Sequence, residues 1–157
     1  ASPTSRGVHM NPGPAVRLAV VACPFCSTVN RVDLARLADL PKCGQCHKPI
    51  RLDRPVAASE ADFDQSVQGT AVPVLADFYA DWCGPCRITA PMLDEIAQAN
   101  AGLVLVLKVD TDRHPGLATR LGIRGIPTII AFRDGREAHR VVGVPQPGVL
   151  ASLIATP

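Results

Sequence analysis

All six cysteines of this 157-residue chain lie in Cys-x-x-Cys pairs. Two thiols at this spacing can bind a metal ion or form a redox disulfide, and a pair followed directly by His can also attach a c-type haem. Cys46 is followed by His47, so the second pair fits all three chemistries. The pairs are Cys23/Cys26, Cys43/Cys46 and Cys83/Cys86.

The third pair follows an apolar run and precedes a helical pattern, so we expect Cys83 at a strand-to-helix corner. The free N–H groups and the dipole of a helix N-terminus favour an anion there, which lowers the pKa of Cys83 and makes it the nucleophile. Cys86, one turn into the helix, is expected to be less exposed and to act as the resolving thiol. The alternative is a structural disulfide, which a reducing compartment and shielding by Trp82 both disfavour.

Two charged residues interrupt runs that are otherwise apolar. Asp77 lies within residues 72–80 and Lys108 within residues 103–110. Burial is expected to raise the pKa of Asp77, which could then take a proton from Cys86 through a water molecule. A buried ion pair between Asp77 and Lys108 is the alternative, and the two interpretations are compatible.

The first two pairs have the spacing Cys-x2-Cys-x16-Cys-x2-Cys, which is typical of a zinc site with four thiolate ligands. We expect one structural zinc ion, because residues 16–52 have few large apolar side chains and need the stability that a metal supplies. Two disulfides or an iron–sulfur centre are alternatives. Haem attachment at the second pair would leave the first pair without partners. The expected ligands are Cys23, Cys26, Cys43 and Cys46.

The charge distribution also divides the chain in two. Residues 10–52 contain six Lys or Arg and two acids, whereas residues 53–157 contain nine and twelve. No dense basic run predicts nucleic-acid binding. No membrane span or export signal is recognised, so we expect a cytoplasmic protein. The expected parts are an expression-tag remnant at residues 1–10, a zinc-ribbon-like module at 16–52 and a second domain at 53–157.

Residues 53–157 predict a central sheet with helices on both faces, because the two longest apolar runs are typical of strands buried on both sides. Ser59 is expected to cap the first helix of this part, and Asp134-Gly135 to form a hairpin turn. Strands are expected at 56–58, 72–80 and 103–110 and on both sides of that turn. Helices are expected at 59–68, 86–99, 115–122 and 146–154, with a short helix within 32–40.

Two motifs resemble the thioredoxin family. Residues 82–86, Trp-Cys-Gly-Pro-Cys, match its active-site motif, and residues 125–128, Gly-Ile-Pro-Thr, are similar to its cis-proline loop. The resemblance extends over residues 55–156 and includes Asp77, Lys108 and Pro91. It implies an α/β thioredoxin fold, in which helices flank a central mixed sheet, following the zinc-ribbon-like module. With the two N-terminal pairs, the chain is most similar to the zinc-containing bacterial thioredoxin 2 type.

The resemblance implies a protein-disulfide reductase that acts on disulfide-containing proteins and is restored by a thioredoxin reductase. Catalysis is assigned to Cys83, Cys86, Asp77 and Lys108. The substrate-binding residues that it implies are Trp82, Gly84, Pro85, Ile126 and Pro127, with a cis bond before Pro127. One rival hypothesis is a zinc-dependent binding or chaperone module with a redox-sensing dithiol. A second is a thiol oxidase or isomerase.

Overall fold

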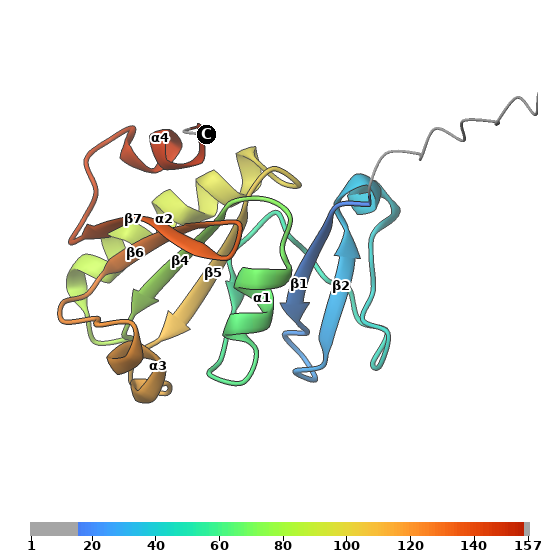
Figure 1. Ribbon diagram of the computed structural model, residues 1–157, viewed down its shortest axis with the longest axis horizontal. Helices are drawn as coiled ribbons and strands as arrows, with labels where there is room; N and C mark the ends of the chain where they lie inside the picture. Colours follow the sequence, from blue (N-terminus) through green and yellow to red (C-terminus); the bar gives the residue numbers. More distant parts are fainter. Residues whose placement is uncertain (1–15, 156–157) are drawn as a thin grey trace, which may run out of the picture.

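The computed structural model describes residues 16–155, which form two β-sheets (Figure 1). The first sheet is an antiparallel hairpin of β1 (Leu18–Ala22) and β2 (Val29–Asp33). A 3-10 helix, η1 (Leu34–Asp39), follows it, and the Asp33 side chain accepts a hydrogen bond from the Ala35 N–H at its start. The predicted tag remnant at residues 1–10 lies outside the described residues.

The second sheet has five strands in the order β3-β5-β4-β6-β7. The neighbours β3, β5 and β4 are parallel, and β6 and β7 continue the sheet in antiparallel fashion, so the sheet is mixed as predicted. Its strands are β3 (Val56–Ala57), β4 (Val74–Tyr79), β5 (Leu105–Asp110), β6 (Thr128–Arg133) and β7 (Arg136–Val142).

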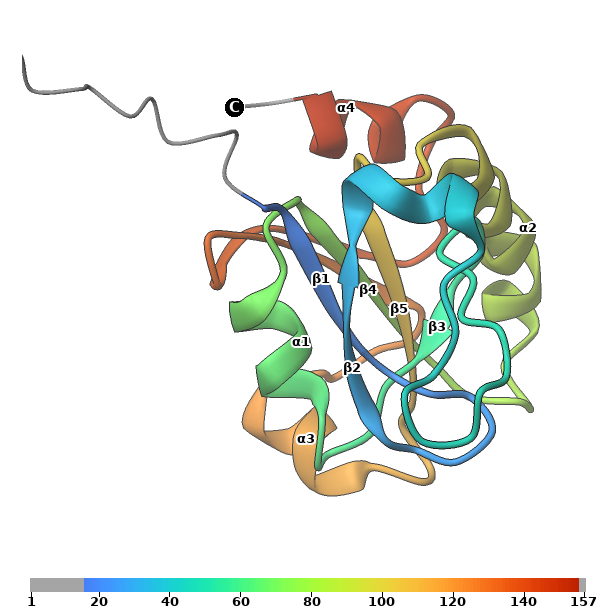
Figure 2. The same cartoon turned by 90° about the vertical axis from the view of Figure 1, so that its right-hand side faces the viewer.

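Helices cover both faces of this sheet, with α1 and α2 on opposite sides (Figure 2). Alternate residues of β4 divide between the two layers: Leu75 packs with α2 and α4, whereas Phe78 packs with α1 and α3. Because side chains alternate along a strand, Asp77 points to the same face as Leu75, toward α2. The helices are α1 (Phe63–Gly69), α2 (Gly84–Ala99), α3 (Pro115–Arg120) and α4 (Val149–Ala155).

The hairpin packs against the five-stranded part through α1. The Ala71 N–H donates to the Leu18 carbonyl at 2.8 Å, and the Val20 N–H donates to Thr70 Oγ1 at 3.1 Å. Ala19 and Val21 of β1 belong to the same buried cluster as Phe63 and Phe78. The N-terminal segment therefore shares a core with the large sheet, and the division after residue 52 stays a prediction.

Two predicted helix starts are wrong. Ser59 does not cap α1, which begins at Phe63; its backbone N–H and its hydroxyl both donate to the Asp62 carboxylate, forming a turn ahead of the helix. The last helix begins at Val149, directly after Gly148, whose positive φ of 86° ends the preceding turn. In the part of the chain that is described, no helix is both long and apolar enough to cross a membrane.

Candidate redox site and metal centre

Cys83 and Cys86 form a disulfide at the start of α2, with their Cα atoms 5.3 Å apart. Cys83 is the N-cap residue of this helix, and its Sγ accepts a hydrogen bond from the Cys86 N–H at 3.2 Å. The predicted strand-to-helix corner is thus present between β4 and α2. An N–H donor directed at Sγ, at the positive end of a helix, stabilises a thiolate there once the disulfide is reduced.

The burial of this pair differs from the prediction. Cys83 is 3% exposed and Cys86 is 4% exposed, so the resolving position is no more buried than the nucleophile in this disulfide form. Trp82 is itself 70% exposed, and its shielding of the pair stays a prediction. Its Nε1 donates to Asp112 Oδ2 at 2.9 Å, which fixes the indole ring beside the disulfide. The sequence did not indicate this role for Asp112, because nothing distinguishes it from the other polar residues of its loop.

A groove of about 540 Å³ runs past the disulfide. The peptide bond between Ile126 and Pro127 is cis, as predicted, and the Ile126 carbonyl oxygen lies 3.8 Å from Cys83 Sγ. Pro127 is buried, and its carbonyl accepts from the Gly143 N–H, which ties the loop to the end of β7. The groove is lined by Trp82, Gly84, Pro85, Ile123, Arg124 and Ile126, among others.

Asp77 and Lys108 are opposite one another on β4 and β5. Asp77 is 5% exposed, and its Oδ1 has no hydrogen-bond partner among the described residues. Lys108 is exposed, and no ion pair joins the two side chains in the described part of the chain. The prediction of a buried ion pair is therefore wrong, because Lys108 is exposed and forms no ion pair with Asp77.

Asp77 and Lys108 also line a common cavity of about 560 Å³ against α2. Ala90 and Leu93, four and seven residues after Cys86, line this cavity and lie on the same helix face as that cysteine. Burial raises the pKa of Asp77 to about 7, and the nearby Lys108 charge opposes this shift. A carboxyl group with such a pKa can take up and release a proton near neutral pH.

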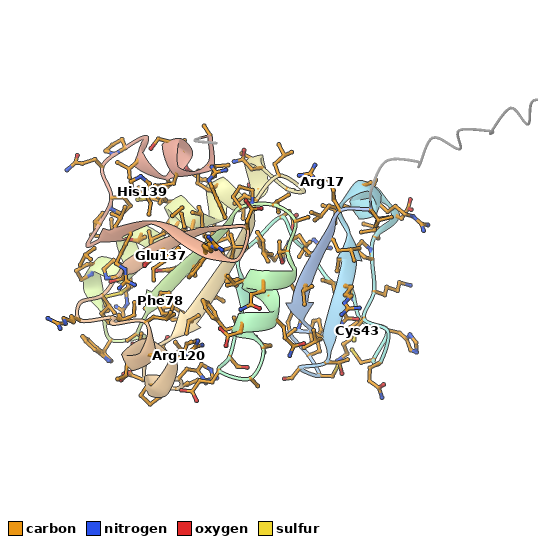
Figure 3. All side chains as sticks on the ribbon, viewed as in Figure 1. Arg17, Cys43, Phe78, Arg120, Glu137 and His139 are labelled. Atoms are coloured by element: carbon orange, nitrogen blue, oxygen red, sulfur yellow. A yellow bond between two sulfur atoms is a disulfide. The ribbon has the colours of Figure 1, made fainter. Side chains whose placement is uncertain are left out.

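The four remaining cysteines converge in space. All four Sγ atoms lie within 4.8 Å of one another, and the Cys23–Cys46 and Cys26–Cys43 sulfur pairs are each 3.6 Å apart. Four thiolates around a tetrahedral zinc ion, with Zn–S bonds of about 2.3 Å, would have their sulfurs about 3.8 Å apart. The donor set and its spacing therefore fit one metal ion. Cys43 lies on the hairpin side of the molecule, away from Glu137 and His139 (Figure 3).

The two cysteine turns have the same backbone pattern. The Ser27 N–H donates to the Cys23 carbonyl, and the His47 N–H donates to the Cys43 carbonyl. Ser27 and His47 each have a φ of 64° and occupy equivalent positions in the two turns. His47 therefore completes a turn through its backbone, and it is outside the cluster of potential ligands.

The electrostatics of the four thiols also favour a bound cation. A hydrogen bond from the Cys46 backbone N–H lowers the pKa of Cys43 to about 6. The Lys48 backbone lowers the pKa of Cys46, but burial and the contacts with the other three thiols outweigh it and raise that pKa to about 11. Four adjacent thiolates repel one another, so full ionisation of the cluster needs a positive ion at its centre.

Asn30 supports this cluster and was missed by the sequence analysis. Its Nδ2 donates to Cys43 Sγ at 3.4 Å and to the Thr28 carbonyl at 2.9 Å, and its Oδ1 accepts from the Gly44 N–H at 3.0 Å. One side chain thus joins the first cysteine turn to the second. A single asparagine in a strand has no spacing pattern that would reveal this contact.

The mixed sheet and the disulfide at the start of α2 define a thiol–disulfide oxidoreductase, with a cluster of four thiols ahead of it. Comparisons with known proteins agree. The thioredoxin family model matches residues 54–156, and a model described as the N-terminal part of thioredoxin 2 matches residues 22–48. The chain belongs to the thioredoxin family, and its two parts match the thioredoxin 2 type.

Individual relatives cover different shares of the chain. Thioredoxin 1 of Synechococcus elongatus is 47% identical over 98 residues, covering 62% of this chain and 92% of that protein. Thioredoxin C-3 of Corynebacterium nephridii is 35% identical over 124 residues, covering 79% and 85%. A solved structure of a mutant thioredoxin from Halobacterium salinarum has a TM-score of 0.61 at 36% identity, covering 67% and 91%. The predicted thioredoxin fold is confirmed.

Proposed function

We propose that this protein reduces disulfide bonds in other proteins, with Cys83 as the nucleophile and Cys86 as the resolving thiol. The observation that carries the proposal is the position of Cys83, at the N-cap of α2 with the Cys86 N–H directed at its sulfur and the cis-proline loop beside it. The groove supports a role for Trp82, Gly84, Pro85 and Ile126 in binding an extended substrate segment. We keep Pro127 as a substrate-binding residue because it follows Ile126 through the cis bond.

The reaction transfers two electrons from the dithiol to the substrate. The Cys83 thiolate attacks one sulfur of the substrate disulfide, and the other sulfur leaves as a thiolate that takes a proton from solvent. Cys86 then loses its proton and attacks the Cys83 sulfur of the mixed disulfide. This step forms the Cys83–Cys86 disulfide and releases the second substrate thiolate. A reductase must supply two electrons to restore the dithiol.

We propose that Asp77 accepts the proton that the Cys86 thiol loses when it attacks the mixed disulfide. With a pKa of about 7, this carboxyl group is ionised in part of the population at neutral pH, and its carboxylate is a stronger base than that of an ordinary aspartate. The cavity shared by Asp77 and residues on the Cys86 face of α2 gives room for a water molecule to carry the proton. Lys108, which lines the same cavity, holds the pKa of Asp77 lower than burial alone would.

We propose a structural role for the metal centre, with Cys23, Cys26, Cys43 and Cys46 as the ligands of one zinc ion. Four thiolates would close the coordination sphere, so the ion would stabilise the fold and leave no position for a substrate. We keep the expectations of disulfide-containing protein substrates, a thioredoxin reductase as electron donor and a cytoplasmic location.

The test is reduction of insulin disulfides coupled to a thioredoxin reductase. We expect Cys83→Ser to reduce the rate to background, because no other residue of the site supplies a nucleophilic thiol on the groove. The matched variant Cys86→Ser should instead accumulate a mixed disulfide with the substrate, detectable by mass spectrometry. Wild-type rates in Cys83→Ser would end the proposal, and substrate binding by a Cys83→Ser/Cys86→Ser variant that depends on the metal would favour the binding-module hypothesis.

A further inference from the structure

The segment Asp53–Pro55 connects the metal-binding part to the five-stranded sheet, and it forms a wall of the Asp77 cavity. The residues on either side of it, Leu52 and Val56, are each only 4% exposed. Val56 is paired with Leu107 of β5, next to Lys108. Anchored at both ends, this connection is a fixed part of the cavity and not a loose linker.

The charged groups around Asp77 come from three elements. Lys108 comes from β5, Asp94 from α2, and Asp53 and Arg54 from the connecting segment, and all four line the cavity with Asp77. On the remaining side, β6 places the apolar residue Ile129 opposite Asp77. Asp77, whose Oδ1 has no hydrogen-bond partner among the described residues, therefore lines a cavity bordered by residues of both signs.

We propose that Asp53, Arg54 and Asp94 form the charged mouth of this cavity and act as positioning residues that set how tightly Asp77 holds its proton. The connecting segment then belongs to the proton-transfer apparatus of the redox site. The inference rests on the proposed function in one respect, which is that Asp77 serves as the proton acceptor for Cys86.

The direction in which each substitution shifts the pKa of Asp77 follows from the charge that it removes. Arg54 Nε lies 3.2 Å from Asp53 Oδ1, so the two charges partly cancel at the mouth of the cavity. Removing the Arg54 charge leaves Asp53 unbalanced, which favours the protonated form of Asp77 and raises its pKa. Removing the Asp53 charge leaves Arg54 unbalanced and lowers that pKa, and removing the Asp94 charge acts in the same direction. If Arg54 and Asp53 only maintained the fold, removing their charges would not shift the pKa of Asp77 in opposite directions.

The experiment is a titration of the Asp77 carboxyl group by carbon-13 NMR in the full-length oxidised protein. We expect Arg54→Gln to raise the titration midpoint, and Asp53→Asn and Asp94→Asn to lower it, each by a few tenths of a pH unit at low salt. Added salt should shrink the shifts, because Arg54 and Asp94 are exposed. The pH profile of insulin reduction should move in the same direction as each midpoint.

Two control variants test whether the shift in the Asp77 midpoint comes from the local charge. One tests for an effect of net charge, and the other for an effect of losing the side chain. Arg136→Gln removes the same charge from β7, at the opposite edge of the sheet, and should leave the midpoint unchanged. Arg54→Lys keeps the charge and should behave as wild type. Shifts of the same sign in Arg54→Gln and Asp53→Asn, or no shift in either at low salt, would overturn the proposal. The NMR titration needs no turnover, so this outcome is distinguishable from a failure of the proposed activity.

Discussion

At the scale of single residues, Asp77 is where function and stability conflict. Its side chain is 5% exposed, and burial raises its pKa from 3.8 to about 7. Between these values the folded protein holds a proton that the unfolded chain has lost. The free energy of unfolding therefore falls as the pH rises through this window, by a total on the order of 4 kcal/mol.

We predict that Asp77→Asn stabilises the protein above neutral pH and slows disulfide reduction. At about pH 8 the variant avoids a buried carboxylate and should gain up to a few kcal/mol, whereas at about pH 4 both proteins carry a neutral side chain and should differ little. Urea unfolding of the oxidised proteins at the two pH values measures this. An equal difference at both pH values would show that the effect is not the charge of Asp77.

Asn30 carries the second residue-scale prediction, because it joins the two cysteine turns through Cys43 Sγ and the Gly44 N–H. Residues that orient metal ligands typically contribute 10- to 100-fold to affinity, so we expect Asn30→Ala to weaken zinc binding by roughly that factor. Competition with a chelating dye measures it. Asn30→Asp keeps the acceptor for Gly44 but loses the donor to sulfur, so it tests which bond matters. Unchanged affinity in Asn30→Ala would exclude the role.

At the scale of elements, the contact between β1 and α1 joins the hairpin to the large sheet. Gly69 is the last residue of α1. The structure gives a packing reason for glycine here: a Cβ at this position would lie 2.6 Å from Val20 Cγ2. The two elements approach too closely for any side chain at position 69.

We predict that Gly69→Ala destabilises the protein by about 1–3 kcal/mol, because the added methyl group must displace a branched side chain on a packed strand. Thermal or urea unfolding measures the loss. The double variant Val20→Ala/Gly69→Ala removes the overlap, so its loss should be smaller than the sum of the single losses. Strictly additive losses would mean that the contact is absent in solution.

At the scale of the whole molecule, the metal-binding part and the redox part share one core. The buried cluster contains Cys23 and Cys43 together with Phe63 and Phe78. Loss of the metal would therefore loosen side chains that also cover the large sheet, even though the dithiol lies elsewhere.

We predict that a chelator lowers the melting temperature of the entire chain by roughly 10 °C, which corresponds to about 3 kcal/mol for a protein of this size. Far-ultraviolet circular dichroism follows the unfolding, and metal analysis before and after should show the loss of one zinc ion per chain. Adding zinc back should restore the original transition. A redox part that melts at the same temperature with and without metal would show that the two parts unfold independently.

The cysteine spacing and the local apolar pattern were enough to predict which cysteines lie together, and to predict β4, β5 and the hairpin of β6 and β7. These features depend on neighbours along the chain, which the sequence displays directly. His47 is a similar case: haem attachment was disfavoured because it would leave Cys23 and Cys26 without partners, and the repeated turn at Ser27 and His47 explains the position of His47.

The sequence by itself therefore determined the fold class and which thiols belong together, because helix and strand periods and ligand spacing are local properties. Only the tertiary structure decided that Lys108 is exposed and unpaired with Asp77, that Asn30 reaches Cys43, and that residues 53–55 line the Asp77 cavity. These outcomes depend on segments that are distant in the chain and packed side by side. A single residue in a strand carries no signal of which distant neighbour, or how much solvent, it will meet.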